Sequence, residues 1–160
     1  MKMDYKTKRF RFQISMFQKG ADEIQKHISR IDEILFKIKA SCVTVWVAIL
    51  GWSFSTHNTL MVPLGGVIII GFWFLEGYFR GIQSRFLISS QAITEFLNNQ
   101  KKLDDCFNKQ RFETNLVYPM THKESEFVKL KMYAKGLIAP SVGILYIFLS
   151  FINYLIWLAL

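Results

Sequence analysis

Long stretches without charge limit most strongly how this chain can fold. Residues 40–75 contain no Lys, Arg, Asp or Glu, and neither do residues 136–160. A helix that crosses a bilayer needs ~20 apolar residues. The first stretch is therefore long enough for two spans joined by a turn, predicted at residues 55–58, and the second for one. We predict three transmembrane helices; the rival interpretation is a single long span followed by a re-entrant segment.

The basic residues predict how these spans are oriented. All 20 Lys and Arg residues lie within residues 1–39 and 80–135. Cytoplasmic segments of membrane proteins are enriched in Lys and Arg, so we expect a multi-pass protein with a cytoplasmic amino terminus and its carboxyl terminus outside. The predicted parts are a cytosolic basic tail with an amphipathic helix (1–39), a two-span hairpin (40–79), a cytosolic helical segment (80–135) and a third transmembrane helix (136–160).

Apolar residues also recur in steps of three and four, which is typical of helices with one packed face. The rhythm predicts a first helix from Phe12 to Ser55. The fold predicted is an all-α integral membrane protein whose first two helices form a long antiparallel hairpin extending into a cytosolic helical stalk. Three stripes carry this prediction: Ile14, Phe17, Ala21, Ile24, Ile28, Ile31, Leu35, Ile38, Cys42, Val45, Ile49 and Trp52; Ile68 to Phe107; and Phe127, Leu130, Ala134, Leu137, Ser141, Ile144, Phe148, Phe151, Leu155 and Leu158.

Two local signals bear on the third helix. Thr121 and Glu124 have the spacing of a capping box, which predicts that the helix begins there. Gly136 and Pro140 are predicted to bend it where it enters the bilayer.

No set of residues suggests catalysis. The histidines, His27, His57 and His122, fall on separate predicted elements, and none has a carboxylate or a cysteine at ligand spacing. No phosphate-binding loop, metal motif or nucleophile elbow is present. We therefore expect no enzyme activity, no catalytic residue, no metal site and no cofactor.

Glu76 is a charged residue at the end of the second predicted span, and ionisable residues at membrane depth are functional candidates. Arg80 follows four residues later, which is the spacing of an ion pair within one helix. The alternative is a ring of Glu76 and Arg80 charges at the mouth or gate of a pore formed by several copies. The two interpretations are compatible.

The amino-terminal residues carry the densest positive charge of the chain. Lys6, Lys8, Arg9 and Arg11 alternate with phenylalanines. Basic and aromatic residues together suit a nucleotide or a single-stranded oligonucleotide, by charge and stacking. The alternative is that the tail folds back and binds anionic lipid heads.

Three spans of one chain are too few to enclose a water path. Packed faces that one hairpin leaves unsatisfied favour self-association, for which closed symmetry is the common solution. We expect a homo-oligomer in the lipid bilayer, with a tetramer as one candidate.

This plan resembles the small membrane effectors of bacterial antiphage systems, namely the SLATT-type effectors and the channel effector of the Hailong system. The resembling stretch is residues 30–86, in which the segment 31–39 leads into the first span and the segment 71–76 closes the second. The third span departs from the two-span SLATT plan. The resemblance implies an ion-conducting pore in the bacterial inner membrane, acting in antiviral defence under control of a nucleotide or oligonucleotide signal from a companion enzyme.

Two other functions stay open at the level of sequence. One is a ligand-independent membrane toxin or holin-like protein, for which a basic tail far from the membrane would serve no purpose. The other is a membrane subunit that recruits a soluble partner through its coiled stalk.

Overall fold

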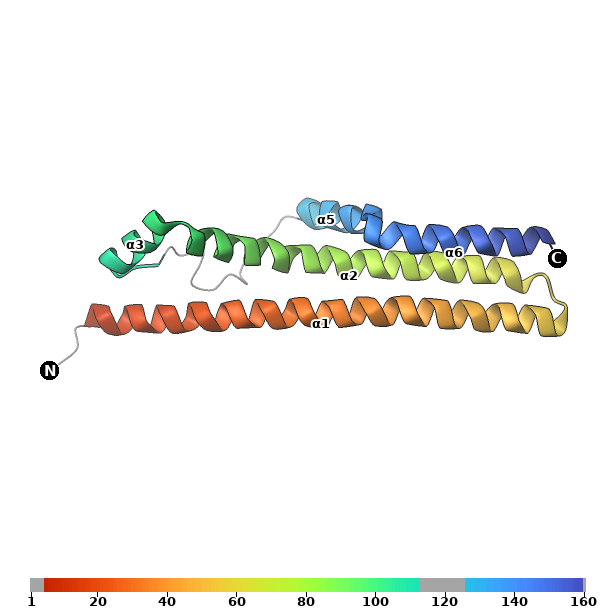
Figure 1. Cartoon of the computed structure of the whole chain (residues 1–160), viewed down its shortest axis with the longest axis horizontal. Coiled ribbons are helices and arrows are strands. Elements are labelled where there is room, and N and C mark those ends of the chain that lie inside the picture. Colours follow the sequence, from red (N-terminus) through yellow and green to blue (C-terminus); the bar gives the residue numbers. More distant parts are fainter. Residues whose placement is uncertain (1–4, 113–125, 160) are drawn as a thin grey trace. The chain divides into compact units, whose positions relative to one another are not determined.

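The computed structural model describes residues 5–112 and 126–159, and every regular element in these ranges is a helix (Figure 1). Three of the helices are long and apolar enough to cross a membrane. The prediction of an all-α protein with three candidate spans is therefore confirmed. The capping box predicted at Thr121 and Glu124 lies outside the described residues. The helices are α1 (Tyr5–Thr56), α2 (Met61–Asn98), α3 (Gln100–Lys109), α5 (Glu126–Ile138) and α6 (Pro140–Ala159).

Helix α1 begins seven residues before the predicted start at Phe12. Lys and Arg, which dominate its first two turns, are good helix formers, and Phe10 within them is buried. The helix ends where His57 takes a left-handed backbone conformation, with φ of 51°. The hydroxyl of Ser53 donates to the carbonyl oxygen of Asn58 at 2.9 Å and closes the turn into α2.

Two breaks interrupt the helices that follow. Asn99 leaves the helical conformation between α2 and α3, and its side chain accepts a hydrogen bond from the amide of Lys102 at 3.1 Å. An Asn side chain favours such a cap over a helix interior. Ala139 separates α5 from α6, and Pro140 occupies the first position of α6, where its missing N–H is harmless. The bend predicted from Gly136 and Pro140 is thus a full interruption.

The chain divides into two compact units. The first, which we call the aromatic unit, comprises residues 1–30 and 85–124; the second, the span unit, comprises residues 31–84 and 125–160. In the aromatic unit the ring of Phe17 stacks on that of Phe112 with centroids 5.4 Å apart. His27 stacks on Phe86 at 5.0 Å. The buried core here follows the predicted stripe of the first helix, as Phe17 and Ile24 show.

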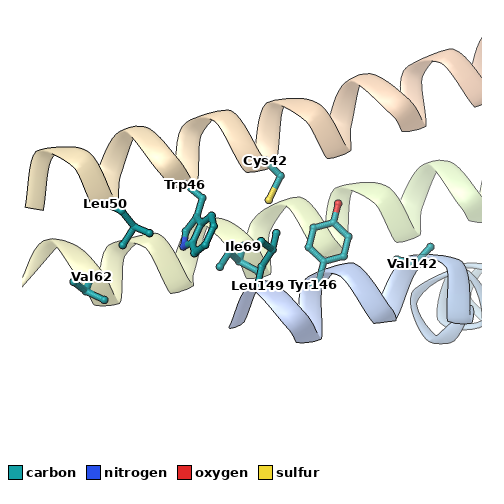
Figure 2. Packing of buried hydrophobic residues seen from close by; sticks show 8 residues of the cluster. All are labelled: Cys42, Trp46, Leu50, Val62, Ile69, Val142, Tyr146 and Leu149. Carbon is teal, nitrogen blue, oxygen red and sulfur yellow. The ribbon is translucent and has the colours of Figure 1, made fainter. Parts of the chain in front are cut away.

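The core of the span unit brings together side chains from α1, α2 and α6 (Figure 2). Figure 2 shows them projecting into one interior, with the hydroxyl of Tyr146 pointing away from α6 toward the other two helices. The cluster consists of Cys42, Trp46 and Leu50 from α1, Val62 and Ile69 from α2, and Val142, Tyr146 and Leu149 from α6.

The stripes predicted within the spans are right only in part: Cys42 is buried as predicted, but most of the other predicted positions are not. In α1 the predicted Trp52 is 57% exposed, whereas Trp46, Leu50 and Ser53 are buried. In α6 the predicted Ile144 is 69% exposed, and the buried face lies elsewhere on the helix. The reason is that nearly every residue of a membrane span is apolar, so apolar spacing does not distinguish the packed face from the lipid face.

Candidate functional site

A buried charged contact joins the three candidate spans. Glu76 on α2 has a fully buried side chain, with 0% exposed. The hydroxyl of Tyr146 on α6 donates to Glu76 Oε2 at 2.8 Å. Lys39 Nζ on α1 lies 3.3 Å from Glu76 Oε1. Each of the three helices therefore contributes one side chain, and we call this set the Glu76 cluster.

Lys39 differs from its partner in burial. Its side chain is 30% exposed, and its Nζ also donates to the carbonyl oxygen of Ser141, in the first turn of α6, at 2.9 Å. A long Lys side chain can keep its ammonium group near water while its stem lies along apolar surface. The carboxylate of Glu76 is buried away from water, so Lys39 and the Tyr146 hydroxyl stabilise its negative charge.

Among the described residues, Glu76 and Arg80 do not form the predicted ion pair. Glu76 contacts Lys39 and Tyr146 instead. Arg80 Nη1 instead donates to Gln83 Oε1 at 2.7 Å. Gln83 Nε2 in turn donates to Asp32 Oδ1 on α1, also at 2.7 Å. The carboxylate of Glu76 is buried within a single chain, so the predicted charge ring at a pore mouth would require that it leave both partners.

A second polar contact lies within the three candidate spans, nearer the turn between α1 and α2. The indole N–H of Trp46 donates to Asn153 Oδ1 at 3.0 Å, and Asn153 Nδ2 donates to the carbonyl oxygen of Val62 at 3.1 Å. All three helices again take part. A Cβ on Gly65 would lie only 3.0 Å from Asn153 Oδ1, so the glycine makes room for the amide. Because the oxygen and the nitrogen of the buried Asn153 amide both form hydrogen bonds, this side chain specifies how the three helices pack together.

Helices α2 and α5 approach so closely that their backbones touch. A Cβ on Gly136 of α5 would lie 2.5 Å from the carbonyl oxygen of Gly77 and 3.1 Å from the amide nitrogen of Gly81, both on α2. Gly77 and Gly81 form the small-xxx-small spacing that lets membrane helices pack at short range. The ring of Tyr78 stacks on Tyr133 of α5 beside this contact, with centroids 5.2 Å apart.

The four basic residues predicted to bind ligand lie in the first two turns of α1, and all four are exposed. Helix spacing puts Lys6 near Arg9 and Lys8 near Arg11, on two different flanks of the helix. Phe10 between them is buried against Phe107 and Phe112, so it is unavailable for stacking on a base.

Phe12, by contrast, is 65% exposed. The tail therefore presents four cations and an exposed aromatic ring. Within residues 5–112 and 126–159, no group of three or more His, Cys, Asp or Glu side chains is placed to hold a metal ion.

Sequence reasoning missed several residues of these contacts. Lys39 and Tyr146 were not predicted as partners of Glu76, and Asn153 was not singled out. Asn153 is a polar residue within the last charge-free stretch, which was a usable signal. The four-residue spacing of Gly77 and Gly81 was another.

Comparison with known protein families, with curated proteins and with solved structures finds no match to this chain.

Proposed function

We propose that this chain is the protomer of a homo-oligomeric ion-conducting pore in the bacterial inner membrane, an effector of antiviral defence controlled by an anionic nucleotide or oligonucleotide. In this proposal α1 and α2 form a long antiparallel hairpin that extends from the bilayer as a cytosolic stalk. The signal would come from a companion enzyme, as the resemblance to SLATT-type and Hailong effectors implies.

The observation that carries the proposal is the contrast between the inner and outer surfaces of the candidate spans. Polar groups, among them Glu76 and Asn153, are buried and partnered inside the bundle. The outer surface is apolar, and only 22–28% of the most apolar 18-residue stretch of each candidate span is buried within one chain. Lipid and further copies of the chain would cover the rest. Several copies are needed to enclose a water path.

The exposed cations at Lys6, Lys8, Arg9 and Arg11 support control by an anion. They lie at one end of α1, and the same helix carries Lys39 and Trp46, which contact the other spans. A ligand that binds at the tail would change the pore only by favouring one of two conformations. Helix α1 offers a covalent path between the two ends.

The experiment is purification of the full chain in detergent, mass determination, and ion flux from liposomes with and without a panel of cyclic nucleotides and short oligonucleotides. The proposal predicts an oligomer whose flux changes with at least one of these ligands. A monomer without conductance would contradict it. Ion flux that no anion alters would favour the toxin or holin-like function. An oligomer without conductance would favour a subunit that recruits a soluble partner.

A matched variant tests the tail. Charge reversal at Lys8, Arg9 and Arg11 is expected to abolish the ligand response while leaving oligomer mass and helix content unchanged, because all three side chains are exposed. The control is charge reversal at Lys101 and Lys102 of α3, which are also exposed. Retained ligand control in the tail variant would exclude the tail as the binding site.

A further inference from the structure

Helix α5 presents an outward face on which large apolar side chains lie beside lysines. Phe127 is 75% exposed, Leu130 65% and Ile138 79%. Lys131 and Lys135 are exposed as well. Residues three, four, seven and eleven positions apart share a helix face, so these side chains form one surface. We call it the outer face of α5.

The contacts of α5 fix this face outward. Gly136 packs against the backbone of Gly77 and Gly81 on α2, and Leu137 and Tyr133 also lie against those two glycines. The opposite side of α5 is therefore held on α2 at backbone distance. The helix cannot turn its apolar residues inward without breaking this packing.

Neither water nor hydrocarbon suits the outer face. In water, three large apolar side chains would be left mostly hydrated, which is unfavourable relative to an apolar setting. In hydrocarbon, the two lysines would be desolvated. The helix is also too short to cross a bilayer: its 13 residues, at 1.5 Å each, span roughly 20 Å of a ~30 Å core.

The boundary between lipid heads and acyl chains suits both kinds of residue, because apolar side chains enter the acyl region while lysines reach the heads. Independent features place α5 at that level. Tyr78 of α2 stacks on Tyr133 of α5, and Tyr is enriched at membrane interfaces. Only Ala139 separates α5 from α6, a candidate span.

We propose that α5 lies at the level of the membrane interface, on the side where α2 leaves the bilayer, and that Lys131 and Lys135 bind anionic lipid heads there. This inference depends on insertion of the spans and not on ion conduction. A chain that conducts nothing can still satisfy it, so its failure and that of the pore are separable.

Depth measurement on the full chain in vesicles tests the placement. A fluorescent label is attached at Leu130→Cys in a chain whose two native cysteines are replaced by alanine. The references are Lys101→Cys, an exposed position of α3, and Phe148→Cys, an exposed apolar position of α6. Circular dichroism and elution volume establish that each variant folds like the parent.

The expected result is intermediate depth at position 130. A water-soluble quencher should act there several-fold less than at position 101, and a quencher attached deep in the acyl chains less than at position 148. Quenching equal to that at position 101 or to that at position 148 would overturn the proposal. Cross-linking between copies through Leu130→Cys would also overturn it, by assigning the face to a second copy.

The lysines are tested by lipid selection. In vesicles of mixed phosphatidylglycerol and phosphatidylcholine, the purified protein should retain the anionic lipid, as mass spectrometry of the co-purified lipids measures. Each lysine lost in Lys131→Gln and Lys135→Gln should lower that preference about fivefold, the effect of ~1 kcal/mol per basic residue at an anionic surface. Lys101→Gln and Lys102→Gln are the controls and should not change it. An unchanged preference in the α5 variants would overturn the lipid-binding part.

Discussion

At the scale of single residues, the two charged members of the Glu76 cluster differ in burial, and this difference has measurable consequences. Glu76 is fully buried, whereas the side chain of Lys39 is 30% exposed. Removal of one partner from a buried ion pair is costly mainly because the other is left as an uncompensated buried charge. Removal of Lys39 therefore leaves a fully buried carboxylate without its counter-charge, which is costly. Removal of Glu76 costs less, because the partly exposed lysine can still be hydrated.

Lys39→Met is therefore expected to lower the free energy of unfolding by about 3–5 kcal/mol, and Glu76→Gln by less. The glutamine amide still offers an oxygen to the Tyr146 hydroxyl, and Lys39 can turn toward water. The double variant should recover much of the stability lost in Lys39→Met. Thermal unfolding of the full chain in detergent, followed by circular dichroism, measures all three.

The matched control is Lys37→Met, two residues away. Lys37 pairs with Glu33 at 2.6 Å, but both side chains are mostly exposed, so its loss should cost only about 0.5 kcal/mol or less. Equal effects of Lys37→Met and Lys39→Met would show that the buried contact contributes no more than a surface pair.

At the scale of elements, the sequence predicted helix content well and packed faces only in part. The stripe through Phe17, Ile24 and Ile31 is buried as expected, because polar residues between them face outward and mark the apolar side. Within the spans that contrast disappears. The residues that mark the interior there are polar or small, such as Ser53, Glu76 and Asn153.

The candidate site was predictable to the same limited extent. Glu76 stood out because it is charged at the end of a span, but its partners did not follow from spacing along one helix. Lys39 and Tyr146 come from elements distant in sequence, so only tertiary packing brings them together. The four-residue rule favoured Arg80, which the structure pairs with Gln83 instead.

The contact between α2 and α5 gives a prediction at this scale. Gly136→Ala puts a methyl group against backbone atoms of Gly77 and Gly81, which cannot move aside as a side chain would. We expect a loss of about 1–3 kcal/mol, typical of overpacking, measured by thermal unfolding in detergent.

Gly71→Ala on α2 is the control for that substitution, because no atom lies within 4 Å of the added methyl group. It should be neutral or slightly stabilising, since Ala favours the helix more than Gly does. A neutral Gly136→Ala would mean that α5 does not pack on α2 at backbone distance.

At the scale of the whole molecule, the pore, its control by an anion and the interfacial position of α5 all assume that three helices cross the bilayer. The predicted topology places the ends of the chain on opposite sides. It also places the turn after α1 on the side opposite the basic tail. A single span followed by a re-entrant segment would instead place α3 on the side opposite the basic tail.

Labelling of single cysteines with a membrane-impermeant maleimide, in cells that express the full chain with its native cysteines replaced by alanine, tests this topology most directly. Thr59→Cys in the turn and Ala159→Cys at the end of α6 are predicted to react in intact cells. Arg11→Cys and Lys102→Cys are predicted to react only after the cells are permeabilised. Reaction of Thr59→Cys from the same side as Arg11→Cys, or of Arg11→Cys and Lys102→Cys from opposite sides, would contradict the three-span account.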